Sequence, residues 1–201
     1  MAAFKTTLMN CQSCGRKIMV RAADAEKGQI TCSHPGCGAV NVLQSAFYYD
    51  QSLAEGLPAF GQLVYLSGST SVVLPLRLGE NLIGIDDACQ VRVERYLHDG
   101  RCYISRRHAT LTVTFDKWRG NLRYQLQDGF VNLGDKALKN SLNGTFLNGT
   151  HLRPTEQIDV ADADVITLGG IDQFRLMHQP IDPIMRDTYK VDTRLALDQT
   201  Q

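Results

Sequence analysis

The sequence lacks a net charge, a long apolar run and a high aromatic content. Its 201 residues carry 21 basic and 21 acidic side chains, so the formal net charge is zero. A balanced charge gives no general attraction to nucleic acid or to acidic membrane surfaces, which disfavours nucleic acid as a partner. No apolar run approaches the about 20 residues that span a bilayer, and we expect no membrane partner.

Residues 1–9 lack the charged region and apolar run that are typical of a secretory signal. We therefore expect a cytoplasmic protein. In a reducing compartment, closely spaced cysteines are expected to bind a metal rather than to form disulfides. The six cysteines of the chain are interpreted on that basis.

Patterns of common enzyme sites are also missing. The sequence has no nucleotide-binding loop, no paired carboxylates at a catalytic spacing and no open metal site. A catalytic pair of Ser105 and His108 would need a third orienting group and an oxyanion hole, and no pattern requires either. We expect that the protein is not an enzyme.

Four of the cysteines form two close pairs near the N-terminus. The pairs are Cys11 with Cys14 and Cys32 with Cys37, and a glycine follows the second cysteine of each pair. Two such turns on successive hairpins can bring four thiolates to one tetrahedral zinc ion. This arrangement resembles a zinc ribbon. His34 is an alternative third ligand in place of Cys32, and disulfides or free thiols are the competing interpretation.

A module of this size cannot bury enough apolar surface to fold without a staple. A closed four-cysteine site leaves no open position for water, so the expected zinc is structural. The ribbon also has a mild basic bias from Lys5, Arg16, Lys17, Arg21 and Lys27. No set of aromatic side chains accompanies these charges, which favours a solvated face over a nucleic-acid surface.

From Gln62 onwards, short alternating segments and turn residues predict an all-β sandwich. Isolated Cys89 and Cys102 are expected in its core. The predicted strands are 62–66, 71–76, 79–84, 91–95, 102–104, 109–115, 121–127, 144–147 and 165–168, with a closing strand near 174–177.

Two polar loops lie within this all-β region. Ser105-Arg106-Arg107-His108 precedes a strand, and Ser141-Leu142-Asn143-Gly144-Thr145 opens a segment with two Asn-Gly pairs. With Asn81 to Gly84 before them and Asp164 to Gly169 after them, they resemble the forkhead-associated (FHA) domain over roughly residues 62–178. That resemblance implies a β-sandwich that binds phosphothreonine peptides.

The resemblance also implies roles for individual residues. Ser105 is expected to contact phosphate, and Asn143 to hold the backbone of the bound peptide. Arg106 and Arg107 are candidate phosphate contacts, because an arginine fork suits a phosphate group. The residues expected to hold the loops in place are Gly84, His108, Ser141 and Gly144.

Two positions depart from the family pattern. Ile85 stands where the family has arginine after glycine, and Leu142 lacks the hydroxyl often found before asparagine. Two hypotheses follow: a phosphothreonine reader that manages without that arginine, or a scaffold that binds a protein partner without phosphate.

We therefore expect a small adaptor with four parts: a zinc ribbon over 1–46, a connector over 47–61, an FHA-like sandwich over 62–179 and a polar tail over 180–201. Its expected partner is a threonine-phosphorylated protein. The tail holds Thr188 and Thr193, whose phosphorylation would permit self-association through the sandwich.

Overall fold

The computed structural model describes residues 7–21, 24, 27, 29–42, 47–67, 72–132 and 134–192. Lys5 and Thr193 lie outside the described residues, as do the ends of the predicted ribbon and tail. The contacts divide the chain into two compact units, which are described separately: one runs from Tyr49 to Tyr189, and the other comprises residues up to Tyr48 with those from Lys190. None of the helices among the described residues is long and apolar enough to cross a membrane.

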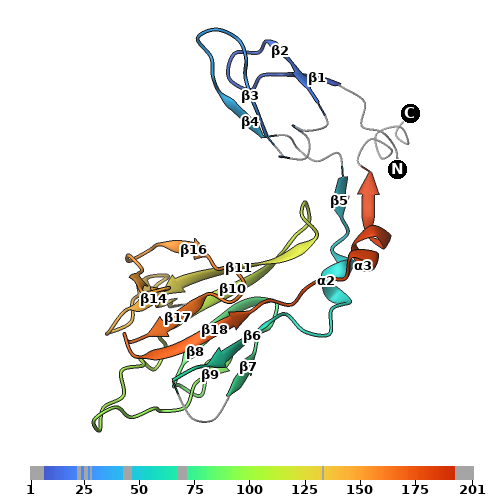
Figure 1. The fold of residues 1–201 in the computed structure, drawn as a ribbon. Helices are drawn as coiled ribbons and strands as arrows, with labels where there is room; N and C mark the ends of the chain where they lie inside the picture. The colour runs from blue at the N-terminus through green and yellow to red at the C-terminus, as the bar shows by residue number, and fades with distance from the viewer. Residues whose placement is uncertain are drawn as a thin grey trace. The chain divides into compact units, whose positions relative to one another are not determined.

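The smaller unit contains two antiparallel hairpins (Figure 1). In β2, Ile18 and Val20 are buried while Met19 between them is exposed, the alternation of a strand with one covered face. Its core is a small cluster of Cys11, Ile18 and Cys32. The hairpin strands are β1 (Thr7–Asn10) with β2 (Lys17–Val20), and β3 (Gln29–Thr31) with β4 (Val40–Val42).

The larger unit is a sandwich of two sheets. One sheet has the order β16-β11-β10-β8-β9, and the other has the order β15-β14-β17-β18-β6-β7. All neighbouring strands in them are antiparallel except β8 and β9. The strands are β6 (Gln62–Tyr65), β7 (Val73–Pro75), β8 (Gly79–Gly84), β9 (Val91–Arg92), β10 (Ala109–Asp116), β11 (Asn121–Asp128), β14 (Thr145–Leu147), β15 (Thr150–His151), β16 (Gln157–Asp159), β17 (Val165–Leu168) and β18 (Asp172–Met177).

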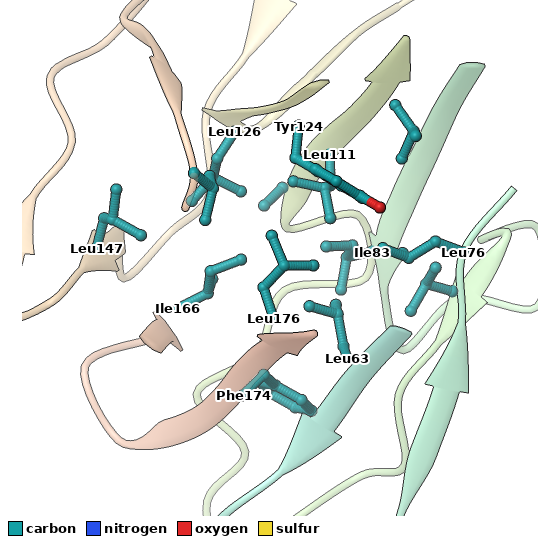
Figure 2. Close-up of a cluster of buried hydrophobic side chains, with 14 of the residues drawn as sticks. Leu63, Leu76, Ile83, Leu111, Tyr124, Leu126, Leu147, Ile166, Phe174 and Leu176 are labelled. Atoms are coloured by element: carbon teal, nitrogen blue, oxygen red, sulfur yellow. The ribbon is translucent and has the colours of Figure 1, made fainter. Parts of the chain in front are cut away.

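The two sheets share one hydrophobic core (Figure 2). Leu111 and Leu126 enter it from one sheet, and Ile166, Phe174 and Leu176 enter it from the other; each is fully buried. Alternate residues of β11 and of β18 face this core, as the period of two requires. The predicted all-β class and sandwich architecture are confirmed.

Short elements lie between the sandwich strands and beside them in sequence. β12 (Phe130–Val131) pairs with β13 (Leu138–Lys139), and β5 (Phe47–Tyr49) pairs with β19 (Lys190–Asp192). Two short helices, α2 (Ser52–Glu55) and α3 (Pro183–Thr188), flank the sandwich strands in sequence. Leu53 of α2 is fully buried in the core, and Met185 of α3 packs against it.

Candidate functional site

Two loops meet at the ends of β10 and β14. The first loop precedes β10 and holds Ser105 to His108, and the second joins β13 to β14 and holds Ser141 to Gly144. Both carry residues that the sequence singled out. Hydrogen bonds between the loops fix how these residues face one another.

The His108 ring connects the two loops. Its Nδ1 accepts a hydrogen bond from the backbone N–H of Ser105 at 2.9 Å, and its Nε2 donates to the carbonyl oxygen of Gly144 at 3.0 Å. The side chain is fully buried, and this burial lowers the pKa of His108. The imidazole is therefore neutral, with its proton on Nε2.

Ser105 presents its hydroxyl beside the second loop. Its Oγ accepts a hydrogen bond from the backbone N–H of Leu142 at 3.1 Å. A hydroxyl also has one donor, and no acceptor takes that proton among the described residues. The Ser105 O–H is available to a phosphate oxygen.

Asn143 lies exposed at the tip of the second loop. Its Nδ2 donates to the carbonyl oxygen of Tyr103 at 2.8 Å, which orients the carboxamide. The amide oxygen Oδ1 receives no hydrogen bond in the part of the chain that the structure describes. It can accept a backbone N–H from a bound peptide.

Hydrogen bonds to Asp128 anchor the second loop. Its carboxylate accepts hydrogen bonds from Ser141 Oγ at 2.7 Å, Thr145 Oγ1 at 2.6 Å, Asn140 Nδ2 at 3.1 Å and the Ser141 backbone N–H at 3.1 Å. Ser141 Oγ in turn accepts from the Gly144 N–H at 2.9 Å. Sequence reasoning missed Asp128, because its partners lie 12 to 17 residues further along the chain.

Gly84 lets β8 run directly against the first loop. A Cβ atom at Gly84 would collide with the carbonyl group of Arg106. The next residue, Ile85, donates its N–H to the Ser105 carbonyl at 3.4 Å, and its half-buried side chain packs against the core. The position where the family has arginine is therefore next to Ser105, but here it is apolar.

Three arginines lie on the first loop or just before it. Arg101, Arg106 and Arg107 are all exposed. The guanidinium carbon of Arg107 lies 5.2 Å from the centre of the Phe130 ring, a cation–π contact. The side chains of Arg101 and Arg106 have no ion pair or hydrogen bond among the described residues, and Arg106 is the one of these two that follows Ser105 directly.

The FHA family model matches residues 81–169, from β8 to the end of β17. Both loops lie inside this match. Residues 81–169 are an FHA domain. The predicted family resemblance is confirmed for this segment, and FHA domains are interaction modules for phosphothreonine-containing peptides rather than enzymes.

Solved FHA structures are similar to the chain. The FHA domain of yeast Dun1, in complex with a doubly phosphorylated peptide, is 20% identical with a TM-score of 0.46, over 64% of this chain and 82% of that one. The FHA domain of an Arabidopsis thaliana hypothetical protein is 22% identical with a TM-score of 0.43, over 61% of this chain and 87% of that one. No curated protein matches the chain.

Outside the FHA domain, the smaller unit gathers Cys11, Cys14, Cys32 and Cys37. Their sulfur atoms all lie within 4.8 Å of one another, and all four are free thiols. Cys11 Sγ is 3.7 Å from Cys37 Sγ, and Cys14 Sγ is 3.8 Å from Cys32 Sγ. A tetrahedron with Zn–S bonds of about 2.3 Å has edges of about 3.8 Å, so the four thiols fit a zinc ion.

Tight turns and backbone N–H groups surround the cysteine cluster. Gly15 and Gly38, after each second cysteine, have positive φ angles of 69° and 56°, which glycine adopts without strain. The backbone N–H of Cys14 is the main cause that lowers the pKa of Cys11 to about 6. A lowered pKa favours the thiolate, the form that binds metal, at Cys11. At Cys32 the backbone N–H of His34 lowers the pKa, but burial and the neighbouring cysteine side chains outweigh it and raise the pKa to about 12.

Asn41 ties the two cysteine turns together, and sequence reasoning missed it. Its side chain is fully buried; Oδ1 accepts from the Gln12 N–H at 2.7 Å, and Nδ2 donates to the Ala39 carbonyl at 3.0 Å. The signal was present in the strand Val-Asn-Val, where alternation places the asparagine opposite two exposed valines.

His34 lies on the second cysteine turn but outside the sulfur cluster. Its Nε2 donates to the Lys17 carbonyl at 3.1 Å, whereas Cys32 Sγ lies within the cluster. The geometry therefore favours Cys32 over His34 as the third ligand.

Proposed function

We propose that this protein is a non-enzymatic adaptor that binds threonine-phosphorylated protein segments through its FHA domain. Ser105 donates its hydroxyl to the phosphate, Asn143 accepts a backbone N–H of the bound segment, and Arg106 supplies a charge. Arg107 contributes at longer range. The protein acts in the cytoplasm, with an N-terminal ribbon over residues 1–46 that a structural zinc ion holds together.

One observation carries this proposal. The Ser105 hydroxyl and the Asn143 amide oxygen lie on two loops that the buried His108 joins, and each has unused hydrogen-bonding capacity. Protein groups that are already held in place before binding lose little entropy when the ligand binds. A rim of this kind suits a ligand that offers both a phosphate and a peptide backbone.

The apolar Ile85 limits the expected affinity. A charge-assisted hydrogen bond to phosphate contributes about 1.5–3 kcal/mol, which corresponds to about ten- to more than a hundredfold in affinity. Without an arginine at that position, Arg106 is the compensating cation. We expect phosphopeptide dissociation constants in the micromolar range or weaker.

The same residue supports a second candidate function. Ile85 and Leu142 supply neither the charge nor the hydroxyl that the family pattern has at these positions. If the remaining phosphate contacts are too few, the FHA domain acts as a scaffold that binds its protein partner without phosphate. This alternative predicts a partner whose affinity does not change when phosphatase removes its phosphate groups.

The deciding experiment compares binding to degenerate peptide libraries centred on threonine and on phosphothreonine. Ser105→Ala and Asn143→Ala are the test variants, and Asn121→Ala, an exposed asparagine at the start of β11, is the matched control. We expect phosphorylation-dependent binding that both test variants lose and the control keeps. Equal binding to both libraries at high micromolar concentration would overturn the phosphate reader in favour of the scaffold.

Self-association through a phosphorylated tail is a subsidiary part of the proposal. Thr188 lies at the end of α3, where its hydroxyl donates to the Ile184 carbonyl at 3.0 Å. A kinase would have to break this local bond to use Thr188. An unchanged oligomeric state after stoichiometric phosphorylation of the tail would contradict this route.

A further inference from the structure

Large apolar side chains of the smaller unit face solvent more often than they face its core. Among those that the structure describes, Ile18 and Val20 are buried and Ile30 is half-buried. Four others are between 54% and 62% exposed: Leu8, Met19, Val40 and Val42. Single exposed apolar side chains are common on protein surfaces, so the significance of these four depends on which of them lie together.

The register of the first hairpin places Leu8 and Met19 side by side. Leu8 of β1 lies directly opposite Met19 of β2, and side chains in such a pair share one face, with Cβ atoms about 4.5–5.5 Å apart. Ile18 and Val20, the neighbours of Met19, are buried, and Ile18 packs with Cys11 in the core of the ribbon. The Leu8–Met19 pair therefore lies on the outer face of the β1–β2 hairpin, turned away from the sulfur cluster (Figure 1).

Two cations flank this apolar pair. Lys17 and Arg21 stand two residues before and two residues after Met19, and both are exposed. Exposed and buried residues alternate over this stretch, which places both cations on the same side as Met19. Neither cationic side chain has an ion pair within the described part of the chain. The Asp24 carboxylate accepts the backbone N–H of Arg21 at 3.0 Å, and residues 7–21 contain no acidic residue. The outer face is thus apolar at its centre and positive at both ends.

We propose that the outer face of the β1–β2 hairpin docks an extended acidic segment of a partner protein. The segment has an aliphatic residue with an acidic residue two positions before it and another two positions after it, as in Glu-Gln-Ile-Gln-Glu. The residues that form this docking face are Leu8, Lys17, Met19 and Arg21. The inference goes beyond the phosphopeptide site, because it assigns a second protein-binding surface to the ribbon.

Spacing and charge favour this kind of segment. An extended backbone rises about 3.3 Å per residue, so Lys17 and Arg21 lie about 13 Å apart along it. Two acidic residues four positions apart in an extended segment have the same separation, and the aliphatic side chain halfway between them then meets Leu8 and Met19. Each exposed ion pair contributes up to about fivefold in affinity, and covering the apolar pair contributes about tenfold.

The test uses the full-length protein, purified without chelator, and three fluorescently labelled peptides with Gly-Ser flanks. The acidic peptide has Glu-Gln-Ile-Gln-Glu at its centre, the basic reference has Lys-Gln-Ile-Gln-Lys, and the polar reference has Glu-Gln-Ser-Gln-Glu. We expect the acidic peptide to bind about tenfold more tightly than either reference in fluorescence anisotropy at low salt, and to lose affinity as salt screens the ion pairs. Equal affinities for the three peptides, or no binding at high micromolar concentration, would overturn the docking face.

A double variant, Leu8→Ser with Met19→Ser, assigns the binding to the apolar pair. Both side chains are exposed, so the variant should keep the melting temperature and the zinc content of the parent protein. We expect its affinity for the acidic peptide to fall about tenfold. Val40→Ser with Val42→Ser, an equally exposed apolar pair on the other hairpin, is the matched control and should bind as the parent protein does. An unchanged affinity in the first variant, or an equal loss in the control, would contradict the assignment.

Exchanging the charges tests the role of the two cations without relying on a loss of binding. In the variant Lys17→Glu with Arg21→Glu, the apolar pair stays in place while both ends of the docking face become negative. We expect this variant to bind the basic reference more tightly than the acidic peptide, the reverse of the parent protein. A preference that remains with the acidic peptide would overturn the proposed charge pairing.

Two further measurements distinguish a partner protein from other occupants of the docking face. If a protein that ends at Asp192 binds the acidic peptide about tenfold more tightly than the full-length protein, residues 193–201 occupy the face, and a separate partner is overturned. Vesicles of phosphatidylcholine with about one-fifth phosphatidylserine test an anionic membrane surface. Vesicle binding that Leu8→Ser with Met19→Ser abolishes, together with no peptide binding, would replace the partner protein by a membrane. Neither result depends on whether the FHA domain binds phosphopeptides.

Discussion

The backbone N–H of Ser105 donates to Nδ1 of His108 at 2.9 Å, and this bond fixes the proton of the buried imidazole on Nε2. The neutral ring then donates to the Gly144 carbonyl in the other loop. A protonated ring would have a donor at Nδ1 facing the Ser105 N–H, and one bond would be lost. Loop geometry and the charge state of His108 are therefore coupled.

This coupling predicts acid sensitivity. Burial lowers the pKa of His108 in the folded protein, while in the unfolded chain histidine has a pKa of about 6.5. Below about pH 6.5, His108 binds a proton in the unfolded state but not in the folded state. The free energy of unfolding therefore decreases as pH falls. The slope from this group approaches about 1.4 kcal/mol per pH unit. Urea unfolding between pH 5 and pH 8 measures it.

The variant His108→Gln should lose this part of the slope, although it is less stable at every pH because the buried bonds are impaired. His151→Gln, at an exposed histidine whose ring lies beside Gly144, is the control and should keep the slope. An unchanged slope in His108→Gln would show that other groups cause the acid sensitivity.

The second prediction concerns the contribution of Asp128 to stability. Burial alone would raise its pKa, but hydrogen bonds from Thr145, Ser141 and Asn140 outweigh burial and lower it. Its contribution to stability is present above the unfolded pKa of about 3.9 and is lost as pH falls through the lower folded pKa. Asp128→Asn places an amide donor against hydroxyl and N–H donors, and we expect a loss of about 1.5–3 kcal/mol in the free energy of unfolding.

The control for Asp128 is Asp87→Asn. Asp87 pairs with Arg92 at 2.9 Å on the surface, with 84% of its side chain exposed, and such a pair contributes about 0–1 kcal/mol. Chemical denaturation at neutral pH compares the two variants. Phosphopeptide affinity should fall in Asp128→Asn only, because Ser141 and Gly144 lose their anchor. Equal losses of stability in both variants would contradict the role of Asp128.

Features that depend on local sequence patterns could be predicted from the sequence. Alternation located most strands of the sandwich, and the two loops were recognised from their serine, histidine and Asn-Gly positions. It predicted a strand over 102–104, but these residues form no strand; Ile104 is buried there in a loop. An apolar residue signals burial, and burial does not require strand pairing.

Contacts that join distant residues had no local signal. The Tyr65 hydroxyl meets Asp172 across 107 residues, and His98 meets the same carboxyl across 74. Nothing in the sequence near Asp172 distinguishes it from the turn aspartates of the chain. The same reason explains why Asp128 was missed, while Ser141, its partner, was recognised within a motif.

Ile85→Arg is the third prediction. The Ile85 backbone lies against the Ser105 carbonyl, so an arginine side chain there starts beside Ser105, the proposed phosphate contact. We expect about ten- to a hundredfold tighter binding to phosphothreonine peptides, measured by fluorescence anisotropy, with no gain for unphosphorylated peptides. Because Ile85 packs against the core, some stability should be lost.

Two comparisons make the Ile85 result specific. Ile85→Leu keeps an apolar side chain and should bind as the parent protein does. Ile85→Arg combined with Ser105→Ala should lose most of the gain if both side chains contact one phosphate. An arginine that improves binding to threonine and phosphothreonine peptides equally would show only a general charge effect.

The last prediction concerns the cysteine cluster. Cys32→Ser should lower bound zinc from about one ion per chain to well under one, measured by elemental analysis of protein purified without chelator, because three thiols leave the tetrahedron open. His34→Asn should keep the zinc, since the His34 ring donates to Lys17 rather than facing the sulfurs. Cys102→Ser, at a half-buried cysteine outside the cluster, is the control.

Loss of zinc should unfold the ribbon and leave the FHA domain intact. The ribbon core consists mainly of Cys11, Ile18 and Cys32, too small to offset chain entropy without a metal, whereas the sandwich has its own core. Phosphopeptide affinity should therefore be the same in Cys32→Ser and the parent protein. Zinc retained in Cys32→Ser but lost in His34→Asn would reverse the ligand assignment, and a zinc-free parent protein would refute the ribbon.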